Sequence, residues 1–112
     1  MPTPPVTRTP LASIGIGSEH VVERIETVRV EMGPDLASGA HLHPCDVVGC
    51  VVAGSVTLEV EGSEPRVLSA GDAFFEPANR RVTRFDAGEQ GATFIAHYLL
   101  PPGERRLLVM LG

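Results

Sequence analysis

The sequence lacks any apolar run of the roughly 20 residues that a membrane-spanning helix requires. Its first ten residues, MPTPPVTRTP, place four prolines where an export signal needs an apolar stretch. The sequence therefore indicates neither a membrane partner nor export, and we expect a cytoplasmic protein.

Cysteines and basic residues are also scarce. Cys45 and Cys50 are the two cysteines, and without an export signal we expect free thiols and no disulfide. Lysine is absent, and nine arginines face fourteen acidic residues, which gives a formal net charge of -5. The basic cluster Arg80, Arg81 and Arg84 is typical of a solvated turn. Because nucleic-acid binding needs a clustered basic face, we expect no nucleic-acid partner.

The length and composition indicate an ordinary folded protein. The 112 residues, 43% of them hydrophobic and 21% charged, contain no biased tract and are enough for one domain with a sizeable core. We expect residues 1–20 to form a proline-rich arm, whose first ten residues are either poorly ordered or packed on a neighbour. Residues 21–112 are expected to form a single domain.

Glycines and prolines recur every six to twelve residues, with short apolar runs between them. This spacing is typical of an all-β sandwich or barrel, and no segment suits a helix of ten residues. The clearest strands are SVTLEVE at 55–61 and TVRVEM at 27–32, where apolar and polar residues alternate. VVGCVVA at 47–53 is apolar on both faces, as in the middle of a sandwich or at a subunit interface.

Three further segments bring the expected count to about seven or eight strands: AFFE at 73–76, RVTRF at 81–85 and ATFIAHYLL at 92–100. EGSEP at 61–65 and AGEQG at 87–91 are predicted to be hairpin turns, since both are rich in turn-forming residues.

His41 and His43 open the stretch HLHPCDVVGCVVAG at 41–54. On a strand, residues two apart project from the same face, so both imidazoles can converge on one ion. Two histidines with a carboxylate bind transition metals and leave positions open for oxygen or substrate. Because such pairs are common without a metal, the surrounding sequence has to decide.

That surrounding sequence resembles the cupin family over roughly residues 22–101. The first family motif has two histidines flanking one residue, then a glutamate and a glycine. The second has a glycine, a proline, a second glycine and a histidine. The matching residues are His41, His43, Gly54, Gly71 and Pro77. The resemblance implies an all-β double-stranded β-helix, or jelly-roll barrel, whose interior pocket binds a small organic molecule, commonly with iron, manganese, nickel or zinc.

The departures from the pattern fall on the ligands. Val47 stands at the glutamate position and Val82 at the histidine position, so two of the four family ligands are lost. Asn79 replaces the second glycine, and asparagine tolerates the left-handed backbone that a glycine would supply. The metal ligands predicted from the sequence are therefore His41 and His43, completed by water or by another group, or no metal binds at all.

Other side chains are candidates for the completing group. Asp46 is one residue out of phase unless the strand is bulged, whereas Cys45 has the right phase and offers a thiolate. His97 is a pocket candidate on a strand that is apolar in both phases. Glu76 precedes the motif proline, where relatives also carry a glutamate, and it is assigned a structural or pocket-rim role.

Three functions remain open at this point. The first is an enzyme, either with a metal on the two histidines or with an apolar, metal-free pocket in which a histidine is the general acid or base. The second is a non-catalytic, metal-free ligand-binding module, and the third is an inert scaffold. No catalytic residue is identified. The predicted pocket residues are Val47, Phe75, Val82, Phe85 and His97.

A homodimer is also expected. The two-faced apolar strand 47–53, the proline arm and the apolar tail RRLLVMLG at 105–112 offer more hydrophobic surface than one small barrel covers. Cupin relatives often pair as dimers, which agrees with this expectation.

Overall fold

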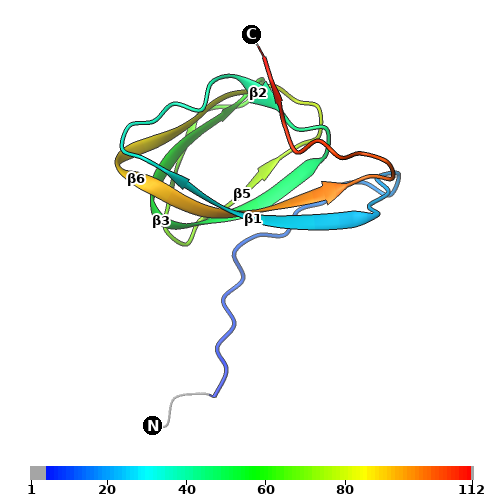
Figure 1. Ribbon diagram of the computed structural model, residues 1–112. Coiled ribbons are helices and arrows are strands. Elements are labelled where there is room, and N and C mark those ends of the chain that lie inside the picture. Colours follow the sequence, from blue (N-terminus) through cyan, green and yellow to red (C-terminus); the bar gives the residue numbers. More distant parts are fainter. Residues whose placement is uncertain (1–4, 112) are drawn as a thin grey trace.

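The structure is a computed structural model that describes residues 5–111, and these contain strands and no helix, as predicted. The strands curl into an all-β barrel, as predicted (Figure 1). The seven strands are β1 (Arg24–Met32), β2 (His41–Leu42), β3 (Asp46–Val60), β4 (Arg66–Ser69), β5 (Ala73–Glu76), β6 (Val82–Leu100) and β7 (Val109–Met110).

Two long strands, β3 and β6, carry the barrel, and they pair antiparallel along most of their length. β6 also pairs with β1 and β2, while β3 pairs with β4 and β5. The segment 47–53 therefore has β6 on one side and β5 on the other over much of its length. Its outward face is not covered by the described residues, since Val52 is 50% exposed, so the middle of a sandwich is wrong and the subunit interface stays a prediction. The predicted strands at 27–32 and 73–76 correspond to β1 and β5.

The predicted turn at 87–91 is wrong. Residues 82–100 form one strand, and the ladder between β3 and β6 is irregular where Gly54 and Val56 pair with Ala92 and Ala87. β3 advances by two residues from Gly54 to Val56 while β6 spans five from Ala92 to Ala87, so β6 carries three extra residues. The glycine-rich stretch therefore bends the strand without reversing the chain. The turn predicted at 61–65 is confirmed, since Ser63 N donates to Val60 O between β3 and β4.

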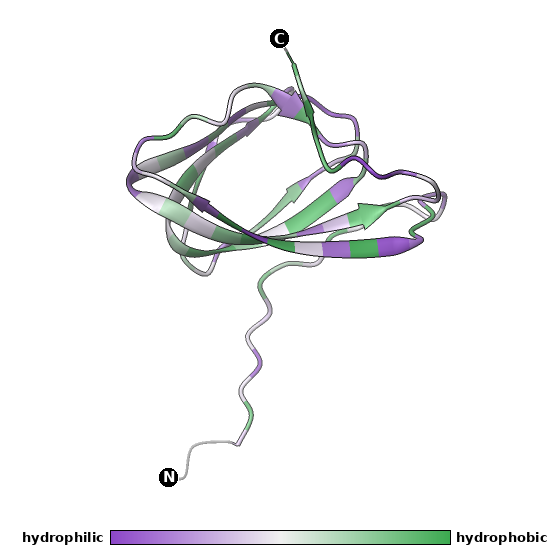
Figure 2. Ribbon diagram, viewed as in Figure 1, coloured by the Kyte–Doolittle hydropathy of each residue, from purple (hydrophilic) through white to green (hydrophobic). Residues whose placement is uncertain are grey.

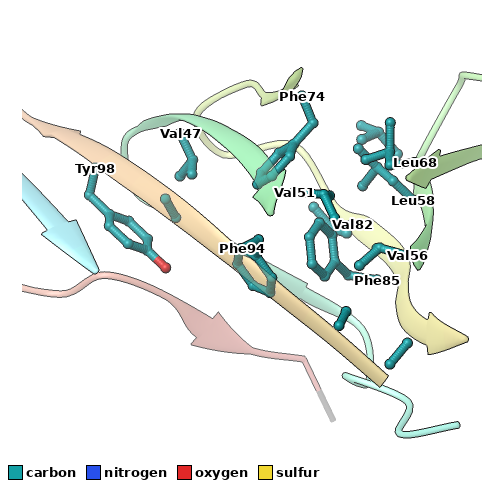
Figure 3. Close-up of a cluster of buried hydrophobic side chains, with 14 of the residues drawn as sticks. Val47, Val51, Val56, Leu58, Leu68, Phe74, Val82, Phe85, Phe94 and Tyr98 are labelled. Carbon is teal, nitrogen blue, oxygen red and sulfur yellow. The ribbon is translucent and has the colours of Figure 1, made fainter. Parts of the chain in front are cut away.

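The core lies inside the barrel, where alternate residues of each strand point inward. Figure 3 shows this cluster, in which Val51, Val56, Val82 and Leu100 are fully buried. Inward-facing Val28, Val30 and Met32 of β1 pack against it from the sheet edge. The period-two pattern of the sequence is thus the pattern of burial, as expected of a sheet with one wet face.

Residues 5–23 form no strand, and Figure 1 shows the chain leading away from the barrel toward the N-terminus. The arm is tied to the barrel near its end, where His20 Nδ1 lies 2.6 Å from Oδ2 of the buried Asp46. The predicted arm boundary at residue 20 and its packing on a neighbour stay predictions, and residues 1–4 lie outside the described residues.

At the other end of the chain, β7 pairs with β2, opposing Met110 to His41 and Val109 to Leu42. Figure 2 shows this closing segment as hydrophobic, and Leu107 packs on the core. The end of the chain therefore lies directly beside the histidine pair. Within residues 5–111 the structure contains no helix that is long and apolar enough to cross a membrane.

The bend at Gly54 gives the first testable prediction. Gly54 has a φ of 72°, and a Cβ there would overlap the carbonyl oxygen of Gly91, which is backbone and cannot move aside. We expect Gly54→Ala to lower the free energy of unfolding by at least about 2 kcal/mol. Gly62→Ala is the matched control, since Gly62 has a φ of 88° with open space around it.

For the control we expect a loss of about 1 kcal/mol, from the left-handed backbone alone. Urea denaturation of the three proteins measures both values. Equal losses for the two variants would show that the close approach of Gly54 to Gly91 does not hold the bend.

Candidate metal site and cavity

Three buried side chains converge inside the barrel: His41, His43 and Glu76, which are 7%, 5% and 3% exposed. His41 lies in β2, His43 follows it, and Glu76 ends β5. The imidazole centroids are 5.0 Å apart, and one ligand atom from each residue lies within 4.8 Å of the others. This is the spacing of a group that can hold one metal ion.

Both imidazoles are oriented by backbone carbonyls. His41 Nδ1 lies 2.9 Å from Gly39 O, and His43 Nδ1 lies 2.7 Å from Leu107 O. A carbonyl only accepts hydrogen bonds, so each Nδ1 carries the proton and each neutral ring presents the lone pair of its Nε2. The same arrangement orients metal-binding histidines in proteins generally.

Both Nε2 atoms face Glu76. Oε2 of this carboxylate lies 2.5 Å from His43 Nε2 and 3.9 Å from His41 Nε2. The close contact with His43 is not directed as a hydrogen bond, and Oε2 is a buried oxygen without a hydrogen-bond partner among the described residues. A buried carboxylate oxygen facing two nitrogen lone pairs is stabilised only by a proton or a cation between them.

The sequence interpretation of Glu76 as a structural or pocket-rim residue misses this arrangement. Glu76 on β5 is the cross-strand partner of Val47 on β3, where the cupin pattern has its glutamate. The carboxylate is thus offered from the neighbouring strand, on the same inward face. The alternation in AFFE indicates which side chains share a face of the strand. The register between β5 and β3, which pairs Glu76 with Val47, cannot be predicted from either segment alone.

The other candidates for the completing group lie elsewhere. Asp46 does not face His41 and His43. Its two oxygens instead contact Ala78 N and His20 Nδ1. Cys45 is buried and free, and burial raises the pKa of its thiol to about 11, with further contributions from the charges of Asp46 and Glu104. At neutral pH it is a protonated thiol, which is a poor ligand.

A cavity of about 240 Å³ adjoins the three residues. Its walls are mostly apolar, and they include the predicted pocket residues Val47 and Phe85. The full lining is Val30, Met32, Ser38, His41, His43, Val47, Phe74, Glu76, Phe85, Phe94, Ala96, Tyr98, Leu108 and Met110.

Three predicted pocket residues are not among the lining. Val82 is fully buried in the core (Figure 3). It pairs with His41 across the ladder between β6 and β2. Phe75 and His97 sit on the outer face, because each lies one residue out of phase with an inward neighbour, Phe74 or Tyr98. His97 instead contacts the Thr27 hydroxyl, at 2.8 Å. The phase of 92–100, ambiguous in sequence, is set by the register with β1 and β3.

Tyr98 adds a hydroxyl to the polar end of the cavity. Its ring packs edge-on against His43, with centroids 5.6 Å apart, and Figure 3 shows it on the same face of β6 as Phe94. Burial, followed by the charges of Glu76 and Cys45, raises the Tyr98 pKa to about 12. The hydroxyl therefore keeps its proton at neutral pH and can donate a hydrogen bond to a ligand.

A family model described as "cupin domain" matches residues 28–98, well over half of the chain. The chain belongs to the cupin family. No curated protein matches this cupin at the sequence level.

Solved structures share the cupin fold at low identity. A DMSP lyase from Ruegeria pomeroyi DSS-3 is 21% identical with a TM-score of 0.68, over 77% of this chain and 42% of the lyase chain. An oxalate oxidase bound to the substrate analogue glycolate is 24% identical with a TM-score of 0.65, over 78% and 46%. A cupin-like protein from Thermotoga maritima MSB8 is 20% identical with a TM-score of 0.67, over 79% and 65%. The chain spans less than half the length of the lyase and the oxidase.

The pairing of His43 with Glu76 predicts a pH-dependent stability of the metal-free protein. Burial alone would lower the pKa of His43, but contact with Glu76, its charge and the Leu107 carbonyl together raise it above 6.5. The folded state therefore binds this proton more tightly than the unfolded state does. The resulting stabilisation is complete below pH 6.5 and is lost as the pH rises through the raised pKa.

Thermal unfolding in the presence of a chelator, at pH values below and above 6.5, measures this pH-dependent stabilisation. We expect the difference in melting temperature between the parent and His43→Gln to be largest at low pH and to shrink as the pH rises. His97→Gln, on the outer face, is the control and should follow the parent. A difference that grows with pH would contradict the assignment.

Proposed function

We propose that this cupin is a metal-dependent enzyme that acts on a small organic molecule in the barrel cavity, with His41, His43 and Glu76 as the protein ligands of the metal. The observation that carries the proposal is the buried Oε2 of Glu76, which has no hydrogen-bond partner within residues 5–111 and faces two imidazole nitrogens. Two histidines and one carboxylate form a donor set used by iron and zinc enzymes.

The three residues fit such an ion chemically. Each Nδ1 is held by a backbone carbonyl, so Nε2 is free to coordinate, and burial keeps competing water away from Glu76. A set of three protein ligands leaves positions open for substrate. A bound transition metal would polarise a substrate oxygen or activate dioxygen there.

The chain's own residues supply the rest of the site. Tyr98 keeps its proton and donates a hydrogen bond to an oxygen of the bound molecule, while the phenylalanines exclude water from its apolar part. The similar lyase and oxidase act, by their names, on DMSP and oxalate, and oxalate decarboxylase from Bacillus subtilis shares the fold. These similarities support catalysis on a small molecule, and the reaction itself is left open.

Elemental analysis of tag-free protein tests the proposal. After incubation with iron, manganese, nickel and zinc and removal of the excess, we expect near-stoichiometric metal in the parent. We expect a loss of more than about tenfold in metal affinity for Glu76→Gln, and no retained metal for His41→Ala/His43→Ala. Glu31→Gln, an exposed carboxylate on the outer face of β1, is the control and should bind as the parent does.

A parent protein that stays metal-free with every ion would overturn the metal site. The second candidate function, a metal-free ligand-binding cupin, would then lead, since the apolar cavity is present whether or not an ion binds.

The homodimer is part of the proposal. Leu108 and Met110 beside the cavity are 45% and 56% exposed, and Ile25 on β1 is 60% exposed, so apolar surface remains on both sides of the barrel. We expect the parent to have the mass of a dimer by size-exclusion chromatography with light scattering. Deleting residues 105–112 should yield monomers or aggregates, and an unchanged dimer would exclude the tail from the interface.

A further inference from the structure

Basic side chains are missing from the interior of this barrel. The nine arginines of the chain are Arg8, Arg24, Arg29, Arg66, Arg80, Arg81, Arg84, Arg105 and Arg106, and all of them are exposed. Lysine is absent from the whole sequence, and residues 1–4 and 112 contribute no basic side chain. The charged groups available to a ligand in the cavity are therefore the Glu76 carboxylate and the two imidazoles.

The ionisable side chains of the lining lie at one end of the cavity, and the hydroxyl of Ser38, a further polar residue of the lining, donates to the Gly39 carbonyl. Val47 on β3 pairs with Tyr98 on β6 at one side and with Glu76 on β5 at the other. One step further, Ala96 is level with Gly49 and Phe74, and beyond them come Phe94 and its partner Val30. The inward-facing residues thus change from ionisable to apolar within two pairs of the ladder.

The apolar end is built mainly of aromatic rings. Phe74, Phe85 and Phe94 pack edge-to-face, with centroid distances of 5.3, 5.8 and 4.8 Å among the three pairs. Rings packed in this way present flat apolar surface and no hydrogen-bond partner. A charged group placed against them would lose its hydration without compensation.

Charge balance limits the other end as well. A divalent ion with one carboxylate and two neutral imidazoles leaves one unit of positive charge. That charge accommodates a single neutral or singly anionic head group. A second charge on the same molecule would lie against the phenylalanines, where no arginine reaches it.

We propose that the cavity selects small molecules with one polar head group and an uncharged, apolar body, and rejects those with a second charge at the far end, such as terminal dicarboxylates. The head group lies at His41, His43 and Glu76, which rests on the proposed function, while the body packs on Phe74, Phe85 and Phe94. At about 240 Å³ the cavity is smaller than the sites of drug-sized ligands, which favours a single ring or a short chain.

Calorimetric titration of the metal-loaded protein with benzyl alcohol, benzoate and terephthalate tests this selection. The three probes share one benzene ring and differ in charge, and terephthalate carries a second carboxylate opposite the first. We expect terephthalate to bind at least about tenfold more weakly than benzoate, because its second carboxylate is desolvated without a partner. Terephthalate binding as tightly as benzoate would overturn the proposal.

The metal-free protein separates this inference from the proposed function. We expect benzyl alcohol to bind it detectably and terephthalate not to, since the apolar end does not depend on the ion. If no metal binds but this preference holds, the metal site is wrong and the selection stands. If metal binds but the preference for benzyl alcohol over terephthalate is absent, the metal site stands and the proposed selection is wrong.

A charge introduced at the apolar end gives an independent check. Met32 lines the cavity at the end of β1, beyond Val30, and it is partly exposed, so Met32→Arg can keep its guanidinium hydrated at the rim. We expect this variant to lower the ratio of the terephthalate dissociation constant to the benzoate dissociation constant by about tenfold. Val67→Arg, on the outward face of β4 and 70% exposed, is the control and should leave the ratio of the terephthalate and benzoate dissociation constants unchanged. If Met32→Arg leaves the affinity ratio between terephthalate and benzoate unchanged, the second carboxylate does not bind at this end of the cavity.

Discussion

The interaction on which this site depends is the approach of one buried carboxylate to two imidazoles whose outer nitrogens are bound to backbone carbonyls. Gly39 and Leu107 fix the rings, and Glu76 faces them from β5. Each carbonyl belongs to a different part of the chain, so the site requires both the loop before β2 and the segment before β7. Such a group is costly to bury without a proton or a cation between its members.

The pairing register of the strands, more than the sequence motif, determines which side chains meet at this site. Glu76 occupies the level of Val47 from the neighbouring strand, and Val82 opposes His41, so both family ligand positions lost to valine border the group that remains. Val47 also makes part of the cavity wall apolar, whereas Val82 is buried in the core outside the lining. At Val47 the loss of a family ligand and the apolar character of the wall are thus one change in the sequence.

Much of the fold follows from the sequence, because alternation and glycine spacing are local. β1, β5, the turn at 61–65 and the left-handed Asn79, with a φ of 60°, are all visible there. The glycines at 87–91 suit a turn or a bulge, so the sequence alone does not distinguish the bend in β6 from a hairpin. The positions of Glu76 and His97 do not follow from the sequence for a different reason. Which residues share a level or a face depends on pairing between distant strands, and neither segment encodes that alone.

X-ray absorption spectroscopy of the metal-loaded protein identifies the atoms bound to the ion and so tests whether His41, His43 and Glu76 hold it. We expect two imidazoles, with the remaining ligands all oxygen, and one oxygen ligand altered in Glu76→Gln. Sulfur scattering from Cys45, a third imidazole, or a spectrum that is identical in Glu76→Gln would contradict this assignment.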